Sequence, residues 1–494
     1  MNKILTFLIA TFIISTSAFS QVVIVNSNCQ NAYVDILSLK FDDAQKRINE
    51  EKQVNPDNVI TDYLENYIDF LKITISEDEN LFKEIEDNIQ IRSDKIRELS
   101  DTSRFKNYFL GNINLQWATV NLRFGNYIAG AFKINRAYRF LEDNDKKFPG
   151  FFPNKITLGV LHIMIGIVPD SYHWLLNLIS MSGTVAQGRK ELTIAYNNCL
   201  ENTDYAFLKD EILFYMGMVD LNLSPGPEYA NYLLSKIDND NKSLLLSYLA
   251  INTRMKNNQN DEALLIFDKI DSTQNYYPFY YLEYLRGDCY LRNLNTEKAS
   301  ASYQIFVKKF TGTNYIKDAW RKIAWCYLID GDIAGYNQFM DSIPMNGETN
   351  IDADKNAENA FQNKNTPSVN LLKARLLSDG GYFKQADSAL TEFNPKSDIQ
   401  KVEKNYRKAR IAHQLMNYDD AKKYYKITIN TGGSFTEYFA ANSALKLGNI
   451  YESENRIDEA GHYYKLCLDM DFDEYRNSIR GKAKQGIERI EETY

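Results

Sequence analysis

Residues 441–469, ANSALKLGNIYESENRIDEAGHYYKLCLD, decide the fold of this chain of 494 residues. Small and large apolar residues alternate on one face of each of two predicted helices, which carry Leu447, Gly448 and Tyr451 in the first and Ala460, Tyr464 and Cys467 in the second. The apolar period breaks at residues 454–458 and then restarts, which predicts a turn there. Because the glycine and the alanine let two helices approach closely while the tyrosines fill the space beside them, the stretch predicts a packed helix–turn–helix unit.

Weaker copies of this unit recur along the C-terminal half of the chain. Gly287 and Ala299 repeat the twelve-residue spacing of Gly448 and Ala460. Marker alanines follow one another at steps of 36, 35 and 39 residues, counted between positions 263 and 299, 386 and 421, and 421 and 460. These steps lie close to the ~34-residue period of the tetratricopeptide repeat. The pattern resembles the tetratricopeptide repeat (TPR) superfamily, which implies an all-α fold, a right-handed α-solenoid of TPR-like helix pairs.

The composition agrees with a helical chain. Only 10 prolines and 23 glycines interrupt it, and every periodic segment has apolar residues three or four positions apart rather than alternating. The spacing therefore predicts an almost entirely helical protein. The formal net charge of −8 gives no support to a nucleic-acid partner.

The first 20 residues predict a secretory signal peptide. Lys3 precedes an apolar run at residues 4–14, and small residues follow as far as Ser20. Because a run of 11 residues is too short to span a bilayer, cleavage after Ser20 is favoured over a retained membrane anchor. The residues before Cys29, Asn26-Ser27-Asn28, do not fit a lipoprotein signal. We therefore expect an exported protein that is periplasmic or outer-membrane-associated.

Beyond the signal peptide (1–20), the sequence predicts two regions. Residues 21–202 form an N-terminal helical region with degenerate repeats and an apolar hairpin at 156–181. Residues 203–494 carry the regular TPR-like repeats. An insertion at 344–367, rich in asparagine and acidic residues, interrupts these repeats.

The apolar hairpin is the least polar stretch after the signal peptide. Ile156–Val168 is apolar on all sides, and Pro169 ends it after 13 residues, so it cannot span a bilayer alone. We expect a packed core hairpin, with a membrane-contacting hairpin as the alternative. His162 and His173 lie in this stretch and are expected to be partnered core histidines rather than metal ligands.

The central segment carries a second resemblance. Its residues resemble the central segment of the family that contains tetratricopeptide repeat protein 39 and the inclusion body clearance protein: Phe152-Pro153-Asn154, Leu158-Gly159, Gly166, Pro169, Tyr172, Trp174, Ser182-Gly183, Gly188 and Leu192. The resemblance is sharp over 150–192 and departs from the family at Thr184, where the family has an acidic residue. Members of that family are not usually exported. The resemblance implies an all-helical repeat scaffold without a known active site.

The five cysteines have no paired spacing. Cys289 and Cys326 hold the same place in consecutive repeats. Equivalent helices of a stack lie ~8–10 Å apart, which exceeds the ~7 Å between Cα atoms that a disulfide tolerates. We therefore expect buried small hydrophobic side chains rather than bridges.

Two aspartates in the insertion have the spacing of a calcium loop. Asp352 and Asp354 are two residues apart, but Ala357 and Asn363 stand where such a loop needs glycine and glutamate. The favoured interpretation is a helix that Asp352 caps.

The sequence contains no recognisable catalytic, cofactor or metal motif. It has no glycine-rich phosphate loop, no Cys or His cluster at metal spacing and no Gly-x-Ser-x-Gly elbow, although 65 acidic residues could still hide a glycosidase pair. We expect a non-enzymatic scaffold or adaptor that binds protein or peptide partners in the cell envelope. The alternative, prompted by 34 tyrosines and 27 phenylalanines, is a carbohydrate- or nutrient-binding accessory protein of an outer-membrane transporter. Peripheral membrane association and the oligomeric state stay open at this point.

The first helices of the C-terminal repeats predict a binding surface. Counting from the small residue of each first helix, the side chains one position after it and three before it are expected to project into a concave groove. From Gly287, Ala324, Ala374 and Ala409, these positions carry Asp288 and Tyr284, Trp325 and Arg321, Arg375 and Leu371, and Arg410 and Tyr406. Guanidinium groups bind carboxylates bidentately, so the groove suits an acidic peptide or one that ends in a carboxylate. The predicted partner-binding residues are Tyr284, Arg321, Trp325, Arg375, Tyr406 and Arg410, and the alternative is that the arginines pair with neighbouring acids on a solvated face.

Overall fold

The computed structural model describes residues 21–168, 181–223, 227–237, 243–271, 273–364 and 366–493. In these residues the chain is helical throughout, and its extended pairing is limited to an isolated bridge between Val22 and Asn58. The predicted all-α fold of helix pairs is therefore confirmed. Among the described helices, none combines the length and the apolar character that crossing a membrane requires.

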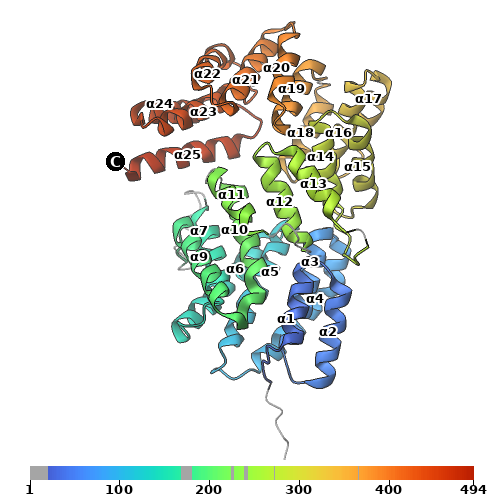
Figure 1. Ribbon diagram of the computed structural model, residues 1–494, viewed down its shortest axis with the longest axis vertical. Coiled ribbons are helices and arrows are strands. Elements are labelled where there is room, and N and C mark those ends of the chain that lie inside the picture. Colours follow the sequence, from blue (N-terminus) through green and yellow to red (C-terminus); the bar gives the residue numbers. More distant parts are fainter. Residues whose placement is uncertain are drawn as a thin grey trace, which may run out of the picture. The chain divides into compact units, whose positions relative to one another are not determined.

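Helices in the N-terminal part of the chain are mostly long. In chain order (Figure 1) they are α1 (Ser27–Leu37), α2 (Phe41–Val54), α3 (Ile60–Ser76), α4 (Glu79–Arg97), α5 (Arg104–Arg123), α6 (Tyr127–Lys147), α7 (Asn154–Gly166), α9 (Val185–Glu201) and the 3-10 helix η2 (Thr203–Leu208). Neighbours along the chain pack together as α1 with α2, α5 with α6, and α7 with α9.

Shorter helices follow and repeat the pairing more regularly. They are α10 (Lys209–Leu223), α11 (Pro227–Lys236), α12 (Leu244–Lys256), α13 (Asn260–Lys269), α14 (Tyr281–Arg292), α15 (Thr296–Lys309), α16 (Ile316–Ile329), α17 (Ile333–Met340), α18 (Asp352–Gln362), α19 (Val369–Gly380), α20 (Phe383–Thr391), α21 (Asp398–Gln414), α22 (Tyr418–Gly432), α23 (Phe439–Ser453), α24 (Ile457–Asp469) and α25 (Arg476–Thr493).

The chain divides into two compact units, and each is described by itself. Unit 1 comprises Met1–Leu71 and Asn80–Ile212, and unit 2 comprises Lys72–Glu79 and Leu213–Tyr494. The core of unit 1 includes the fully buried Trp117, whose indole N–H donates to Asn66 Oδ1 at 2.7 Å. The Asn66 amide in turn donates to Gln116 at 2.8 Å. A large aromatic side chain can be buried here because its one polar group has a partner.

The first arm of the apolar hairpin, helix α7, is buried within unit 1. Its Gly159 faces Gly188 of α9 so closely that a Cβ atom on Gly188 would lie 2.3 Å from the Gly159 carbonyl oxygen. His162 is buried and lies 2.5 Å, Nδ1 to Oε2, from Glu191, so it is a partnered core histidine as predicted. The second part of the predicted hairpin, with Pro169, Asp170 and His173, lies outside the described residues.

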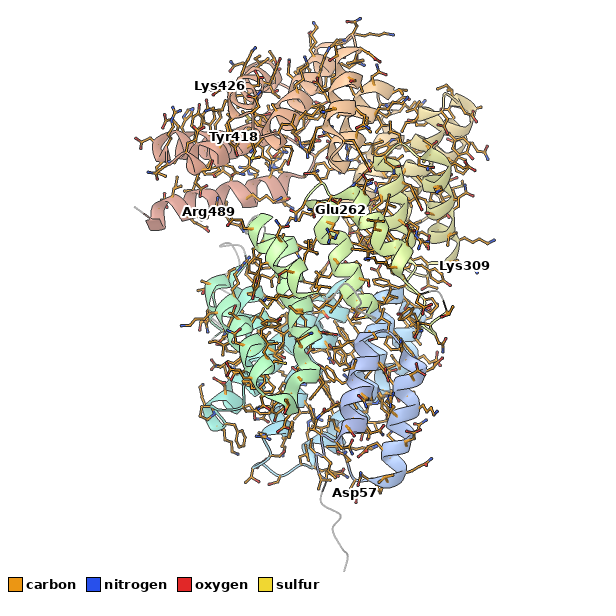
Figure 2. All side chains as sticks on the ribbon, viewed as in Figure 1. Asp57, Glu262, Lys309, Tyr418, Lys426 and Arg489 are labelled. Carbon is orange, nitrogen blue, oxygen red and sulfur yellow. The ribbon has the colours of Figure 1, made fainter. Side chains whose placement is uncertain are left out.

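Unit 2 stacks its helix pairs through the small residues that mark the repeats. The pairs are α14 with α15, α16 with α17, α19 with α20, α21 with α22, and α23 with α24. First helices also contact one another, since α19 packs on α16 and α21, and α23 on α21. The last helix, α25, packs on α23 and α24, where Arg489 (Figure 2) donates to Glu452 at 2.9 and 2.8 Å.

The insertion contains helix α18, and its capping differs from the prediction. Asp352 is the first residue of the helix, the N-cap position is Ile351, and no side chain caps it. The fully buried Asp354 instead accepts hydrogen bonds from the backbone N–H groups of Tyr315, at 2.6 Å, and Asp318, at 2.9 Å. These donors belong to the start of α16. Asp354 therefore accepts hydrogen bonds from N–H groups that have no partner within that helix. The sequence could not show this because the capping residue and the capped helix are separated by the whole of α17.

All five cysteines are free and buried, which confirms that they act as small hydrophobic side chains. Burial raises the pKa of the Cys289 and Cys326 thiols to about 12. Such thiols stay protonated at neutral pH and are poor nucleophiles.

Candidate functional site

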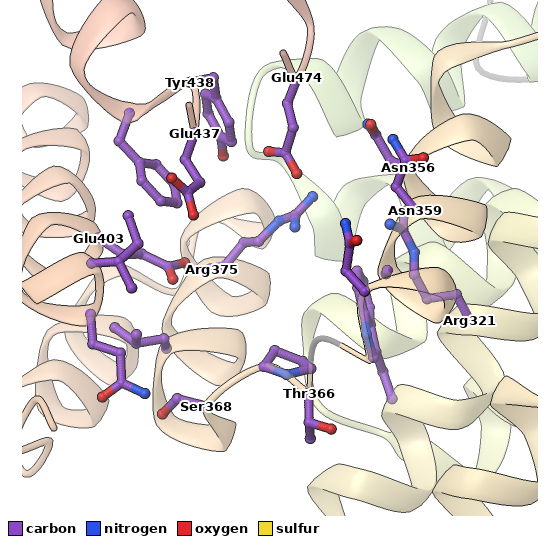
Figure 3. Close-up of a pocket in the computed structure, with 18 of the residues that line it drawn as sticks. Arg321, Asn356, Asn359, Thr366, Ser368, Arg375, Glu403, Glu437, Tyr438 and Glu474 are labelled. Carbon is purple, nitrogen blue, oxygen red and sulfur yellow. The ribbon is translucent and has the colours of Figure 1, made fainter. Parts of the chain in front are cut away.

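A cavity of about 420 Å³ lies in unit 2 among the first helices of successive pairs. Helices α16, α17, α18, α19 and α21 contribute to its lining, together with the segments before α19, α23 and α25. Figure 3 shows Arg375 extending into it, with Glu403 and Glu437 on one side, Arg321 with Asn356 and Asn359 on the other, and Glu474 above. A volume of this size falls within the range of ~300–1,000 Å³ that ligand pockets occupy.

The side that we call the basic wall consists of Arg321, Trp325, Asn356 and Arg375. Trp325 contacts both guanidinium groups, with the Arg321 Cζ 4.9 Å and the Arg375 Cζ 5.5 Å from its ring centroid. Both arginines come from first helices, α16 and α19, which pack on each other. Cation–π contacts of this kind hold a guanidinium in place without using its N–H groups.

A buried ionic network holds the Arg321 side chain in place. Its guanidinium pairs with Asp318. Asp318 also accepts a hydrogen bond from the Tyr284 hydroxyl at 2.7 Å and forms an ion pair with Lys322 at 2.9 Å. Lys322 further contacts Asp288 at 2.6 Å. Burial alone would raise the pKa of Asp318, but Lys322 and Arg321 hold that pKa well below its usual range. Asp318 therefore stays ionised at neutral pH and positions Arg321.

Three nitrogen atoms in the cavity lining lack a hydrogen-bond partner in the described part of the chain. They are Arg321 Nε, Asn356 Nδ2 and Arg407 Nη1. The side chains of Arg321 and Arg407 are only 9% and 3% exposed. Since a buried donor without an acceptor costs roughly 1–3 kcal/mol, these atoms mark where a ligand could supply acceptor oxygens.

The opposite side, which we call the acidic wall, consists of Glu403, Glu437 and Glu474. Glu403 pairs with Arg407 at 2.8 Å, whereas Glu437 and Glu474 form no ion pair or hydrogen bond with described residues. The segments that carry these two residues are joined, because the Asp473 N–H donates to the Thr436 carbonyl at 2.9 Å and the Tyr438 ring meets the Tyr475 ring edge-on at 5.2 Å.

Burial raises the pKa of Glu474. The nearby Arg375 and Arg321 counteract that rise, while Glu437 and Glu403 add to it. The carboxyl group thus lies in a low-dielectric site where neighbouring charges of both signs act on it. A cationic group placed beside it would stabilise its ionised form.

Three of the six predicted site residues, Arg321, Trp325 and Arg375, line the cavity, and the other three do not. Tyr284 and Tyr406 are buried between helices, where the Tyr406 hydroxyl accepts from Asn442 at 2.7 Å. Arg410 pairs with Asp379 at 3.2 Å outside the cavity.

The sequence prediction missed the acidic wall and Arg407. Glu437 and Glu474 precede α23 and α25 and fall in the turns between pairs, outside the helix positions that the repeat pattern numbers. Arg407 follows Tyr406, so the rule of counting from the small residue skipped it. A signal did exist, since two short segments before first helices both read Glu-Tyr, at 437–438 and 474–475.

The described residues contain no group of three or more His, Cys, Asp or Glu side chains that could hold a metal ion. The cavity offers charged and amide groups, most of them on helices, which are able to form ion pairs and hydrogen bonds with a ligand.

Comparison with known proteins identifies one repeat. Residues 441–474 match the tetratricopeptide repeat family. No curated protein matches the chain. The crystal structure of yeast Tom70 is similar at 12% sequence identity over 95% of this chain and 95% of that chain, but its TM-score of 0.21 is too low to carry an argument. The matched repeat and the stacked helix pairs of unit 2 support a helical protein-interaction scaffold.

Proposed function

We propose that this protein is a non-enzymatic scaffold that binds a peptide segment of a protein partner in the cavity of unit 2. The observation that carries the proposal is the set of unpaired donors, from Arg321, Asn356 and Arg407, on first helices and the insertion. Acidic groups of a partner would accept hydrogen bonds from this set and from Arg375. Repeat scaffolds commonly bind extended peptides on the surface formed by their first helices.

Arg375 is the residue that tests this proposal best. Its side chain is 32% exposed and its only ion pair among described residues, with Asp379, is long at 3.9 Å. Arg375→Gln is expected to reduce partner binding about tenfold, because it removes a charge-assisted contact worth ~1.5 kcal/mol or more. The measurement is recovery of partners from envelope fractions by the tagged protein, followed by titration of the recovered partner.

Arg410→Gln is the matched control for this experiment. Arg410 pairs with the same Asp379 and is similarly exposed, at 26%, but lies outside the cavity. Its replacement is expected to leave partner recovery unchanged. Equal recovery by wild type and Arg375→Gln, or equal losses in both variants, would contradict binding in the cavity. Arg321 is unsuitable for this test because its removal would leave the buried Asp318 short of a partner.

We also propose that the protein acts outside the cytoplasm, in the periplasm or at the outer membrane. The support is the order of residues 1–20, in which a charged residue is followed by an apolar run and then by small residues. N-terminal sequencing of the protein from envelope fractions is expected to begin at Gln21. A chain that retains Met1 and stays with the cytoplasmic fraction would contradict export.

The resemblance of residues 150–192 to the family of tetratricopeptide repeat protein 39 and the inclusion body clearance protein stays a prediction. It accords with the same proposal, because it implies a repeat scaffold without a known active site. The carbohydrate-binding alternative has weaker support, since tyrosines such as Tyr303, Tyr406, Tyr425 and Tyr464 are fully buried packing residues.

A further inference from the structure

We propose that the segment bound in this cavity carries both charges, an acidic side chain against the basic wall and a lysine or arginine side chain against the acidic wall. This inference rests on the proposed function and deepens it. It changes the expected partner from an acidic peptide to a mixed-charge one. Three features of the cavity carry it: the balance of its charges, the groups on both walls without a partner in the described chain, and the amide side chains of the lining.

The charges that line the cavity are balanced. Arg321, Arg375 and Arg407 line it together with Glu403, Glu437 and Glu474; Arg407 pairs with Glu403, and Arg321 pairs with Asp318, which lies outside the lining. A purely acidic ligand would bury Glu437 and Glu474 beside its own negative charge. A purely basic ligand would do the same to Arg375. Both outcomes are costly because a charge taken out of water needs a partner.

Each wall also has unsatisfied groups. On the basic wall, Arg321 Nε and Asn356 Nδ2 have no acceptor among described residues. On the acidic wall, neither Glu437 nor Glu474 forms an ion pair or hydrogen bond with the described chain. A ligand that carries one carboxylate and one ammonium or guanidinium group would supply the missing partner on both walls.

The aromatic side chains beside the acidic wall favour a cationic group there. Tyr438 and Tyr475 line the cavity next to Glu437 and Glu474, the two carboxylates without a partner in the described chain, and the two rings meet edge-on at 5.2 Å. A cation near a carboxylate and an aromatic face is attracted by both. The basic wall has the opposite preference, for an anion. Its aromatic ring, Trp325, already contacts the guanidinium groups of Arg321 and Arg375, whose positive charges attract an acidic group.

The amide side chains point to a peptide rather than to a free amino acid. Asn356, Asn359, Asn363 and Gln400 line the same cavity. An amide side chain can donate to a carbonyl and accept from an N–H group, which is the pattern of a peptide backbone. The cavity therefore offers hydrogen-bonding groups for a main chain in addition to its charged side chains.

The inference is tested with the full mature protein and end-blocked, fluorescein-labelled peptides. In one pool an Asp and a Lys are separated by a varied number of alanines. Two matched pools carry Asn for Asp or Gln for Lys. Fluorescence anisotropy is expected to show binding of the mixed-charge pool at least about tenfold tighter than of either single-charge pool, since each pool lacks one charged contact. Equal binding of the Asp-only pool would overturn the inference.

Protein variants assign each charge to a wall. The double variant Glu437→Gln and Glu474→Gln should bind peptides with Lys and with Gln equally well, but should still prefer Asp to Asn. Arg375→Gln should bind peptides with Asp and with Asn equally well, but should still prefer Lys to Gln. Asp471→Asn is the control, because Asp471 belongs to the segment before α25 but is 85% exposed and pairs with Arg476 at 2.9 Å. Suppose that Arg375→Gln no longer binds the protein partner, while the double glutamate variant still binds it and still prefers the peptides that contain Lys. The proposed function then stands and this inference fails. If neither variant changes binding, both fail. Displacement of the peptides by free lysine or aspartate at equal concentration would also overturn a peptide ligand.

Discussion

Replacing Lys322 with methionine is expected to lower the free energy of unfolding by roughly 3–5 kcal/mol, because it removes the buried cation that Asp288 and Asp318 share. Lys322 Nζ lies 2.6 Å from Asp288, 2.9 Å from Asp318 and 2.7 Å from the Tyr284 hydroxyl. Methionine fills similar space but supplies no charge. Urea unfolding followed by circular dichroism measures the change. Hydrogen exchange should show the loss of protection in α14 and α16.

Lys355→Met is the matched control for this prediction. Lys355 lies on α18 with 54% of its side chain exposed and a distant acid, Asp352, at 4.0 Å. Its replacement is expected to change stability by less than ~0.5 kcal/mol. Similar effects of the two substitutions would contradict a stabilising role for the buried network.

The same network sets a direction for the dependence of stability on pH. The pKa of Asp318 is held well below its ordinary value in the folded chain by Lys322 and Arg321, against the opposing effect of burial. The unfolded chain therefore binds a proton at a higher pH than the folded chain does. The contribution of Asp318 to stability is complete above the unfolded pKa of ~3.9 and is lost as the pH falls below that value.

The helix pairs could be predicted from the sequence because their packing is local. Ala324, Ala374 and Ala409 mark the contact face of each first helix, and each is fully buried. Gly287 lies against the ring of Tyr303, and Gly448 against that of Tyr464, each sixteen positions later within one helix–turn–helix unit. The 3–4 spacing and the small residues therefore contain enough information to place each helix against its neighbour.

The candidate site was only partly predictable, because each half of the counting rule places two of its four residues in the cavity lining: Arg321 and Leu371 three positions before the small residue, and Trp325 and Arg375 one position after it. All residues three positions before the small residue are buried, with exposures of 4% at Tyr284, 8% at Arg321, 2% at Leu371 and 1% at Tyr406. Residues three apart lie on the same helix face, so these side chains follow the small residue into the packing interface. Tyr284 and Tyr406 remain in that interface, whereas Arg321 and Leu371 also line the cavity.

The acidic wall could not be predicted from helix periodicity, because it depends on contacts between segments far apart in the chain. Glu437 and Glu474 come from the turns before α23 and α25, and a backbone hydrogen bond from Asp473 to Thr436 brings them together. Periodicity describes helices and gives no information about how two turns meet. The insertion adds Asn356 to the opposite wall by the same kind of long-range packing.

The second large effect is expected at Gly448, in the stretch that defines the repeat. Gly448→Leu should destabilise the protein at or above the upper end of the ~1–3 kcal/mol range for overpacking. A Cβ atom at this position would lie 2.4 Å from Cε1 and 2.5 Å from Cδ1 of Tyr464. Tyr464 cannot move aside, because a Cβ on Gly486 of α25 would meet the other edge of the ring at 2.6 Å. Its hydroxyl is also held, since it donates to Asn449 Oδ1 at 2.9 Å.

Gly481→Leu distinguishes overpacking from a general effect of replacing a helical glycine. Gly481 lies inside α25, and a Cβ atom there meets nothing within 4 Å. Leucine should stabilise this helix by up to ~1 kcal/mol, because it is a better helix former than glycine. The two substitutions are chemically identical but are expected to shift the thermal midpoint in opposite directions. A Gly448→Leu variant that melts at or above the wild-type temperature would show that α23 and α24 do not meet through Gly448 and Tyr464, and the repeat alignment built on that contact would then be wrong.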